Sequence, residues 1–318
     1  MGTYVARRLL ALLPTMLLAS LIVFITIRLI PGDVIDLMLS QNDIAADRLS
    51  RDQLVAALGL DQPLAWQYLR WVGAIVLHGD LGKSLWQNTP VTELLLARLP
   101  VTFELGAMAL LVGLVIALPI GIYSALRQDT AGDYLGRSFS ILLLAVPSFW
   151  LATMVMVLPA IWWGWSPEVN YVRFADDPWQ NIKQMALPAV VLGASLSAIT
   201  MRMMRTMMLE VLRQDYIRTA WAKGLPERLV VARHALRNAL VPVVTLGALE
   251  LGTLLSGAVL TEQVFSIPGF GKLIVDAVFN RDYPVVQGVV LVTATVYVLL
   301  NLLADVLYVL INPRLRGA

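Results

Sequence analysis

The stretch VTFELGAMALLVGLVIALPIGIYSAL, residues 101–126, is apolar almost throughout and contains one charged side chain, Glu104. A helix needs about 20 apolar residues to cross the hydrocarbon core of a bilayer. The stretch is long enough, so it predicts a transmembrane helix.

Other apolar runs of similar length occur along the chain. Their approximate ranges are 9–30, 136–163, 186–207, 241–261 and 286–311. Four prolines lie within or near the runs: Pro14, Pro119, Pro147 and Pro159. In transmembrane helices such prolines predict kinks rather than helix ends. We therefore predict an all-α membrane protein with six transmembrane helices.

The composition supports the membrane class and excludes several kinds of chemistry. Of the 318 residues, 58% are hydrophobic and only 14% are charged, far from the composition of a soluble domain. The chain has no cysteine, which excludes disulfides, thiolate catalysis and sulfur-ligated metals. Its only histidines are His78 and His234, too few for a histidine metal site. We expect this chain to bind no metal or cofactor of its own.

The N-terminus begins with the order of charged and apolar residues that a secretory signal has. Arg7 and Arg8 precede an apolar stretch from Leu9 to about Ile30. This stretch is longer than the apolar part of a signal peptide, and no small-x-small cleavage site follows it. We therefore predict an uncleaved first span.

The distribution of basic residues predicts the orientation in the membrane. Of the 24 Lys and Arg residues, 14 lie in the N-terminus, the loop at 127–137, the stretch 202–240 and the C-terminal tail. Because short cytoplasmic segments are enriched in basic residues, we expect both termini and residues 202–240 to be cytoplasmic. The expected division is residues 1–30 as N-terminus and first span, 31–100 as an external loop, and 101–318 as spans two to six, with a cytoplasmic loop at 208–240.

The external loop is long enough to carry helices of its own. Ser50 and Gln53 have the spacing of a capping box and Gly59 is a helix stop, while Pro63 suits the first turn of a second helix. One face of that helix is apolar and predicts packing on the spans or at the membrane surface; it carries Leu64, Tyr68, Trp71 and Ile75.

The sequence HGDLGKS, residues 78–84, resembles a nucleotide-binding loop only superficially. A P-loop has four residues between its first glycine and the Gly-Lys pair, whereas Gly79 and Gly82 are separated by two. The segment also lies on the predicted external side. We do not interpret it as a nucleotide site.

Three polar residues lie within the predicted spans. Glu250 is in span five, and Asn301 and Asp305 are one turn apart in span six. An ionised side chain in hydrocarbon costs about 2.5–3.5 kcal/mol or more, so these groups should face the bundle interior or an aqueous cavity. They either line a translocation path or form hydrogen bonds between helices.

The sequence RQDYIRTAWAKGLPERLVVARHALRNALVP, residues 213–242, interrupts the apolar pattern with six basic residues. Asp215 can cap a short helix that starts at Tyr216 and stops at Gly224. Pro226, with Glu227 beside it, suits the start of a second helix that leads into span five.

This segment predicts a short helix held outside the bilayer between two longer ones. Tyr216, Ile217, Ala220 and Trp221 gather toward one side, while Arg218 and Lys223 can reach solvent or acidic groups. Its shape suits docking into a groove on a partner protein. A solvated basic loop that follows the positive-inside rule remains the alternative.

The same segment resembles the cytoplasmic EAA loop of permease subunits of bacterial ABC importers, in the dipeptide and oligopeptide group. The general motif has Glu-Ala-Ala and a glycine where this chain has Arg218, Thr219, Ala220 and Gly224, and Arg237 stands in place of its proline. Both departures are usual in the peptide-type branch. They limit the transfer of detail from sugar importers.

The resemblance covers nearly the whole chain. The segments IRLIPGD, LGLDQPLAWQYLRWV, HGDLGKS, FSIPGFGKLIVDAVFNRDYPVVQG and NPRLR all look like parts of the first of two permease subunits in such systems.

The resemblance implies a six-span type I ABC importer permease and not an enzyme. It implies a second, related permease subunit, two cytoplasmic ATPase subunits that hold ATP and Mg²⁺, and an external substrate-binding protein. It also implies that this chain lies in the bacterial inner membrane. The substrate would be a di- or oligopeptide, or alternatively glutathione, a nickel chelate or another small solute. The residues implied to couple to the ATPases are Asp215, Tyr216, Ile217, Arg218, Thr219, Ala220, Trp221, Lys223 and Gly224.

Two other classes compete with this interpretation. A secondary transporter or channel that works alone should show paired broken helices or charged relays at mid-membrane, and neither is clear in the sequence. An intramembrane hydrolase would need a nucleophile with a base, or a metal cluster, within the spans, and neither histidine lies in one.

Overall fold

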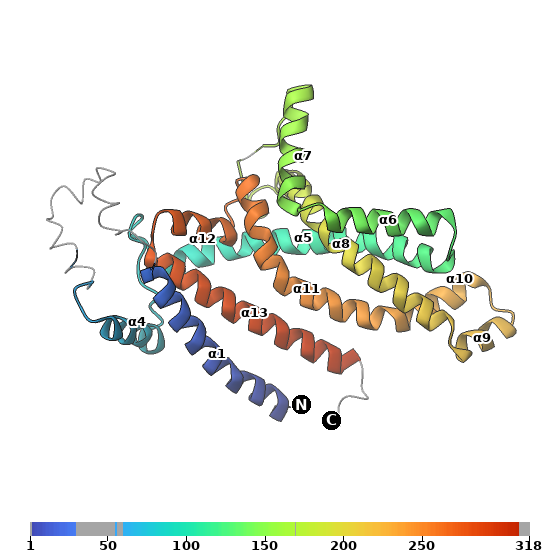
Figure 1. Ribbon diagram of the computed structural model, residues 1–318, viewed down its shortest axis with the longest axis horizontal. Helices are drawn as coiled ribbons and strands as arrows, with labels where there is room; N and C mark the ends of the chain where they lie inside the picture. Colours follow the sequence, from blue (N-terminus) through green and yellow to red (C-terminus); the bar gives the residue numbers. More distant parts are fainter. Residues whose placement is uncertain (1, 30–54, 56–59, 169, 312–318) are drawn as a thin grey trace. The chain divides into compact units, whose positions relative to one another are not determined.

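The structure, a computed structural model, describes residues 2–29, 55, 60–168 and 170–311 (Figure 1). Its regular structure there is helical, apart from an isolated bridge between Lys83 and Pro90. The chain divides into two compact units. Unit 1 comprises residues 1–100 and 272–298, and unit 2 comprises residues 101–271 and 299–318. The association of 272–298 with the N-terminal hundred residues was not part of the predicted division.

The described helices lie in the following order along the chain. Their bounds are α1 Gly2–Leu29, α4 Leu64–His78, α5 Val91–Leu126, α6 Ala131–Ala145, α7 Ser148–Trp163, α8 Pro178–Leu212, α9 Asp215–Ala222, α10 Glu227–Leu229, the π-helix η1 Val230–Ala235, α11 Leu236–Val264, α12 Phe270–Phe279 and α13 Tyr283–Ile311.

The predicted all-α membrane class is confirmed; five of the six predicted spans each fall on one helix, and the third covers the helices α6 and α7. In the described residues, four helical segments are long and apolar enough to cross a membrane: Val91–Leu126, Pro178–Leu212, Glu227–Gly247 and Tyr283–Leu302. A fifth crossing is possible if the bent pair α6 and α7 counts as one span. The first predicted span contributes a shorter apolar helix, Pro14–Leu29.

The third predicted span is broken, and this corrects the expectation that its proline would only kink it. The helices α6 and α7 meet at an angle of 92°. Pro147 precedes α7, and Val146 before it has an extended backbone with φ −90° and ψ 118°. A proline ring disfavours helical geometry in the preceding residue, so the helix ends there. By contrast, Pro14 and Pro159 lie inside continuous helices.

In unit 1, an aromatic cluster joins α1 to α4. The ring of Phe24 lies 5.2 Å from that of Tyr68 and 6.0 Å from that of Trp71, between centroids. The hydroxyls of Ser20 and Tyr68 are 2.9 Å apart and hydrogen bonded. The predicted packing of the apolar face of α4 is therefore confirmed at these two aromatic residues, although Leu64 remains exposed.

The start of α4 lies one position from the predicted one, and its end was not predicted. Pro63 is its N-cap rather than a residue of its first turn, and Gly79 ends it with a left-handed backbone at φ 65°. The predicted capping box of Ser50 and Gln53 and the stop at Gly59 lie outside the described residues.

The loop after α4 is anchored to the segment before α13 within unit 1. The carboxylate of Asp282 accepts hydrogen bonds from Ser84 Oγ at 2.5 Å and from the backbone N–H of Leu85 at 3.2 Å. The indole N–H of Trp86 donates to the carbonyl of Asn280 at 2.7 Å. Burial raises the pKa of the Asp282 carboxyl, although the hydrogen bonds that it accepts from Ser84 and Leu85 oppose the shift.

In unit 2, α5 and α8 approach each other closely through glycines. A Cβ atom added at Gly193 would lie 2.5 Å from the carbonyl oxygen of Ala109, and one at Gly121 would lie 2.8 Å from that of Met201. Any larger residue would push the two backbones apart. This contact supports a buried core whose central members are Leu105, Ala109, Ala152, Met185, Ala189, Val191, Leu192 and Ala258.

A buried carboxylate in unit 2 connects α11 to α5. Glu262 is fully buried and accepts a hydrogen bond from Thr102 Oγ1 at 2.5 Å. Thr102 Oγ1 accepts in turn from the backbone N–H of Phe270 at 2.8 Å. A Cβ atom at Gly269 would collide with the carboxylate, so this tight turn requires glycine.

Candidate functional site

The short helix α9 lies where the sequence predicts it, between the end of α8 and the residues that lead into α11 (Figure 1). Its N-cap is Gln214, which makes no side-chain capping hydrogen bond, and Asp215 is its first residue. The predicted capping role of Asp215 is therefore wrong by one position. Gly224 follows the helix with φ 74°, which confirms the predicted helix stop, because that backbone region favours glycine.

One face of α9 is buried within this chain. Ile217 is fully buried and Ala220 is 6% exposed. Both belong to a cluster whose other buried members come from α5, α8, η1 and α11; these are Ala125, Met204, Met208, Val230, Ala235, Ala239 and Val243. Burying the two side chains contributes about 2–3 kcal/mol. Ala220 thus faces its own chain rather than a partner, which corrects its predicted place on an outward docking face.

The opposite face of α9 is exposed and mixes aromatic with polar groups. Tyr216 and Trp221 are 44% and 43% exposed. Arg218, Thr219 and Lys223 are also exposed. Arg218 lies 3.3 Å from the carboxylate of Asp215, but both groups are so exposed that this ion pair adds little stability.

Hydrogen bonds from α11 hold the segment between α9 and α11 in place. Asn238 Nδ2 donates hydrogen bonds to the hydroxyl of Tyr216 at 2.9 Å and to the carbonyl of His234 at 3.0 Å. Pro226 is the N-cap of α10, as the sequence predicts, but the helix then passes through the π-helical turn η1 before α11. That irregular turn was not predicted.

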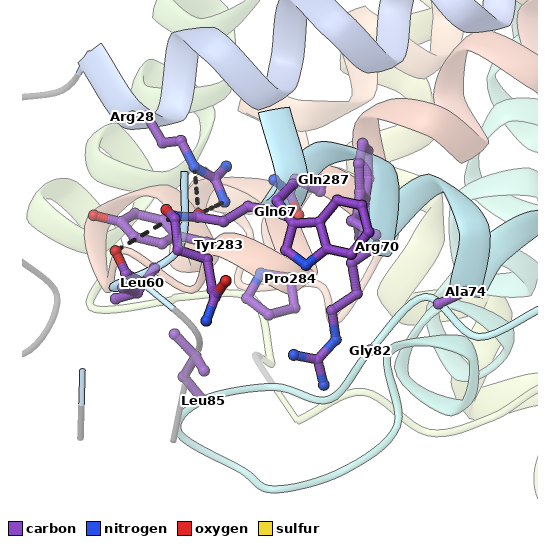
Figure 2. A pocket seen from close by; sticks show the side chains of 13 residues that line it. Arg28, Leu60, Gln67, Arg70, Ala74, Gly82, Leu85, Tyr283, Pro284 and Gln287 are labelled. Atoms are coloured by element: carbon purple, nitrogen blue, oxygen red, sulfur yellow. Dashed lines mark hydrogen bonds between the residues drawn. The ribbon is translucent and has the colours of Figure 1, made fainter. Parts of the chain in front are cut away.

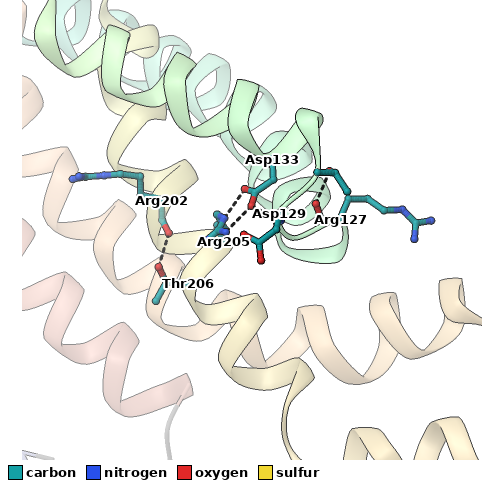
Figure 3. A network of polar contacts seen from close by, with 7 residues as sticks. Arg127, Asp129, Asp133, Arg202, Arg205 and Thr206 are labelled. Atoms are coloured by element: carbon teal, nitrogen blue, oxygen red, sulfur yellow. Dashed lines mark hydrogen bonds and ion pairs between the residues drawn. The ribbon is translucent and has the colours of Figure 1, made fainter.

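A salt bridge joins α6 to α8 (Figure 3). The guanidinium of Arg205 donates to both oxygens of the Asp133 carboxylate, from Nε at 2.8 Å and from Nη2 at 2.7 Å. Asp133 is fully buried and also accepts from the backbone N–H of Asp129 at 3.1 Å. Sequence reasoning missed this pair. The available signal was an acid in the first turn of one helix and an arginine near the end of another.

A second polar pair was also missed. The hydroxyl of Tyr171, in the loop before α8, donates to Glu104 Oε2 at 3.0 Å. The other carboxylate oxygen, Oε1, is buried and has no hydrogen-bond partner in the described part of the chain. Burial, together with the charge of Glu104, raises the pKa of Tyr171 to about 12. This phenol therefore stays protonated and keeps donating at physiological pH.

The three residues predicted to line a path remain a prediction. Glu250 lies in α11 and Asn301 in α13, both partly buried. Asp305 also lies in α13, and its side chain is outside the described set. Among the described residues there is no group of three or more His, Cys, Asp or Glu side chains that could hold a metal ion.

Comparison with known proteins identifies the family. The chain matches the model of the binding-protein-dependent transport system inner membrane component over residues 117–317 and that of its N-terminal region over residues 1–106. It is 40% identical to the dipeptide transport system permease protein of Escherichia coli (strain K12), over 98% of each chain. It is 39% identical to the oligopeptide transport system permease protein of Bacillus subtilis (strain 168), over 99% of this chain and 100% of that protein.

The fold has a solved counterpart. The crystal structure of an amino acid ABC transporter with histidines matches with a TM-score of 0.51 over 70% of this chain and 95% of that chain, at 15% identity. At that identity the match shows the fold alone, which is the type I ABC importer permease fold. The two family models together cover nearly the whole sequence. This chain therefore belongs to the family of binding-protein-dependent transport system inner membrane components, as a permease subunit of an ABC importer and not an enzyme.

Proposed function

We propose that this chain forms half of the translocation path for short peptides and that α9 couples the path to ATPase subunits. The peptide substrate is supported by relatives named as permeases for dipeptides in Escherichia coli and oligopeptides in Bacillus subtilis. The other half of the path would come from a second, homologous permease. Two ATPase subunits would hold ATP and Mg²⁺, and an external binding protein would deliver the peptide.

The observation that carries the coupling role is the division of α9 into two faces. Ile217 and Ala220 fasten the helix to α8 and α11, while Tyr216 and Trp221 remain accessible. Aromatic side chains of this kind often provide much of the binding energy at protein interfaces. Because α9 is packed against its own chain on one side and exposed on the other, a partner that binds and moves the exposed face would also move α8 and α11.

The mechanism requires that the ATPases contact α9 differently in their open and closed states, because a ligand shifts a conformational equilibrium only by its differential affinity. On this proposal, closure of the ATPases moves α9, and the movement reaches the spans through Met204, Met208 and Val230. Glu250, Asn301 and Asp305 would line the path.

The proposed location is the bacterial inner membrane, with both termini and residues 202–240 in the cytoplasm. The excess of basic residues in those segments supports this orientation. It places α9 on the side where ATP is available.

The two faces of α9 can be tested separately with the subunit co-expressed in its own complex. Trp221→Glu changes only the exposed face, so we expect normal amounts of the subunit but much weaker co-purification of the ATPases. Ile217→Ala loosens the anchor by about 2–4 kcal/mol, so we expect the ATPases to remain bound while substrate-stimulated ATP hydrolysis falls.

Arg228→Gln is the matched control, since Arg228 is exposed and lies outside α9. It should leave capture, hydrolysis and uptake unchanged. Normal uptake by both the Trp221→Glu and the Ile217→Ala variants would contradict the coupling role and leave residues 213–242 as an ordinary basic segment.

A further inference from the structure

A pocket of about 310 Å³ lies within unit 1 (Figure 2). Its walls come from the end of α1, one side of α4, the loop after α4 and the first turn of α13. The lining residues used below are Arg28, Trp66, Gln67, Arg70, Trp71 and Tyr283. The volume is at the lower end of the range for small-molecule sites.

The pocket carries positive charge without a balancing acid. Arg28 and Arg70 both line it, and no Asp or Glu is among its described lining residues. Among the described residues, the partners of Arg28 are neutral: it donates to Gln67 Oε1 from Nη2 at 2.8 Å and from Nε at 3.2 Å, and its guanidinium lies 3.5 Å from the centroid of the Phe24 ring. These contacts orient the guanidinium, and none of them supplies a negative charge.

A third donor in the lining is left without an acceptor. The indole Nε1–H of Trp71 is buried and has no hydrogen-bond partner in the described part of the chain. A buried donor without an acceptor costs about 1–3 kcal/mol, and a bound oxyanion would satisfy it. Two guanidiniums and one indole N–H thus favour a ligand rich in acceptors.

The remaining walls are largely apolar and aromatic. The indole of Trp66 is 60% exposed, and Leu85 and Pro284 add aliphatic surface. Such walls bind an apolar body, and planar guanidinium groups match a carboxylate with two parallel hydrogen bonds. Inorganic anions would leave this apolar surface unused.

We propose that this pocket binds a small organic carboxylate that carries an apolar or aromatic group, with the carboxylate at Arg28, Arg70 and Trp71 and the apolar part against Trp66 and Leu85. The C-terminal residue of a short peptide has this chemistry, and so does a free fatty acid. The proposal concerns a binding site in unit 1 and does not depend on the coupling role of α9.

The test uses the full-length subunit in nanodiscs without ATPases, and equilibrium dialysis of radiolabelled N-acetyl-L-phenylalanine. We expect saturable binding that excess N-acetyl-L-phenylalanine displaces and that its uncharged amide does not. Arg70→Gln should weaken binding about tenfold, as expected for a lost charged hydrogen bond. Arg70 is exposed and lies on the surface of α4, so this substitution should not disturb folding.

Trp71→Phe keeps an aromatic ring beside Phe24 and removes only the N–H, so a loss of several-fold is expected. Arg173→Gln, an exposed arginine of unit 2, is the control and should bind normally. Competition by octanoate but not by glycyl-phenylalanine would assign the site to fatty acids, and the reverse would assign it to peptides. Equal competition by the amide, an absence of saturable binding, or unchanged binding in both pocket variants would overturn the proposal.

Discussion

Arg205 near the end of α8 grips the fully buried carboxylate of Asp133 with two hydrogen bonds of 2.8 and 2.7 Å. The two residues are 72 positions apart in the sequence, and their contact fixes the start of α6 against α8. Paired geometry of this kind is stronger and more directional than a single charged hydrogen bond.

Breaking this pair should therefore be costly. Asp133→Ala leaves the guanidinium of Arg205 unpaired in a largely buried position, and we expect a loss of about 3–5 kcal/mol in the free energy of unfolding. The double variant Asp133→Asn with Arg205→Gln should recover much of that loss. Denaturation of the purified subunit in detergent would measure both.

The control for this prediction is Arg127→Ala. Arg127 lies 3.9 Å from Glu227, and the two side chains are 57% and 47% exposed. An exposed pair contributes at most about 1 kcal/mol, so this variant should unfold almost as the parent does. An equal loss in the Asp133 and Arg127 variants would mean that burial does not determine the strength of these pairs.

The Tyr171–Glu104 contact predicts a visible titration. With a pKa of about 12, Tyr171 should be only about 10% ionised at pH 11, whereas a tyrosine of ordinary pKa would be about 90% ionised. The difference in tyrosinate absorbance between the parent and Tyr171→Phe measures this group alone. An absorbance difference at pH 11 as large as that of one ionised tyrosine would contradict the contact.

The sign of the accompanying stability change follows from the raised pKa. Because the folded state holds the phenol proton more tightly than the unfolded chain, the stabilisation is complete below pH 10 and is lost as the pH rises toward 12. Tyr171→Phe should lack this alkaline loss. At neutral pH it should be less stable by about 1–3 kcal/mol, since Glu104 then loses its bonded donor.

The close approach of α5 and α8 predicts a sharp contrast between two glycines. Gly193→Ala would place a Cβ atom 2.5 Å from the carbonyl oxygen of Ala109, so the helices must separate and the subunit should lose about 1–3 kcal/mol of stability. Gly73→Ala, in α4, has nothing within 4 Å of its added Cβ. It should be neutral or slightly stabilising, because alanine favours helix more than glycine does. Thermal denaturation of both variants would test the contrast, and equal midpoints would refute the tight packing.

The proposed orientation can be tested by labelling, since the parent chain contains no cysteine. Gln214→Cys and Gln87→Cys both introduce a thiol at an exposed position. In intact spheroplasts, an impermeant maleimide should react with the cysteine at 87 and reach that at 214 only after the membrane is opened. Labelling in the opposite order would reverse the proposed topology.

Local patterns in the sequence predicted the helices because their causes are local. The six apolar runs all fall on helical segments, and Gly224 ended a helix where a left-handed backbone was expected. The break at Pro147 was underestimated, although the same local rule about the residue before a proline explains it.

Long-range contacts were beyond such reasoning. Nothing local to Asp133 points to Arg205, and nothing local to Tyr171 points to Glu104, because each pairing depends on how separate helices pack. The same limit explains the error at Ala220. Its helical face was predicted from spacing, but only the neighbouring α8 and η1 decide that this face turns inward.

The π-helical turn Val230–Ala235 has a consequence for the length of the chain. A π-bulge accommodates one residue more than the α-helical turn it replaces. Deleting one residue there would convert the bulge into ordinary helix and leave the orientation of Ala239 and Val243 unchanged. The same deletion in regular helix would rotate every later side chain by about 100°. One residue can therefore be removed between α9 and α11 without changing which side chains of α11 face the core.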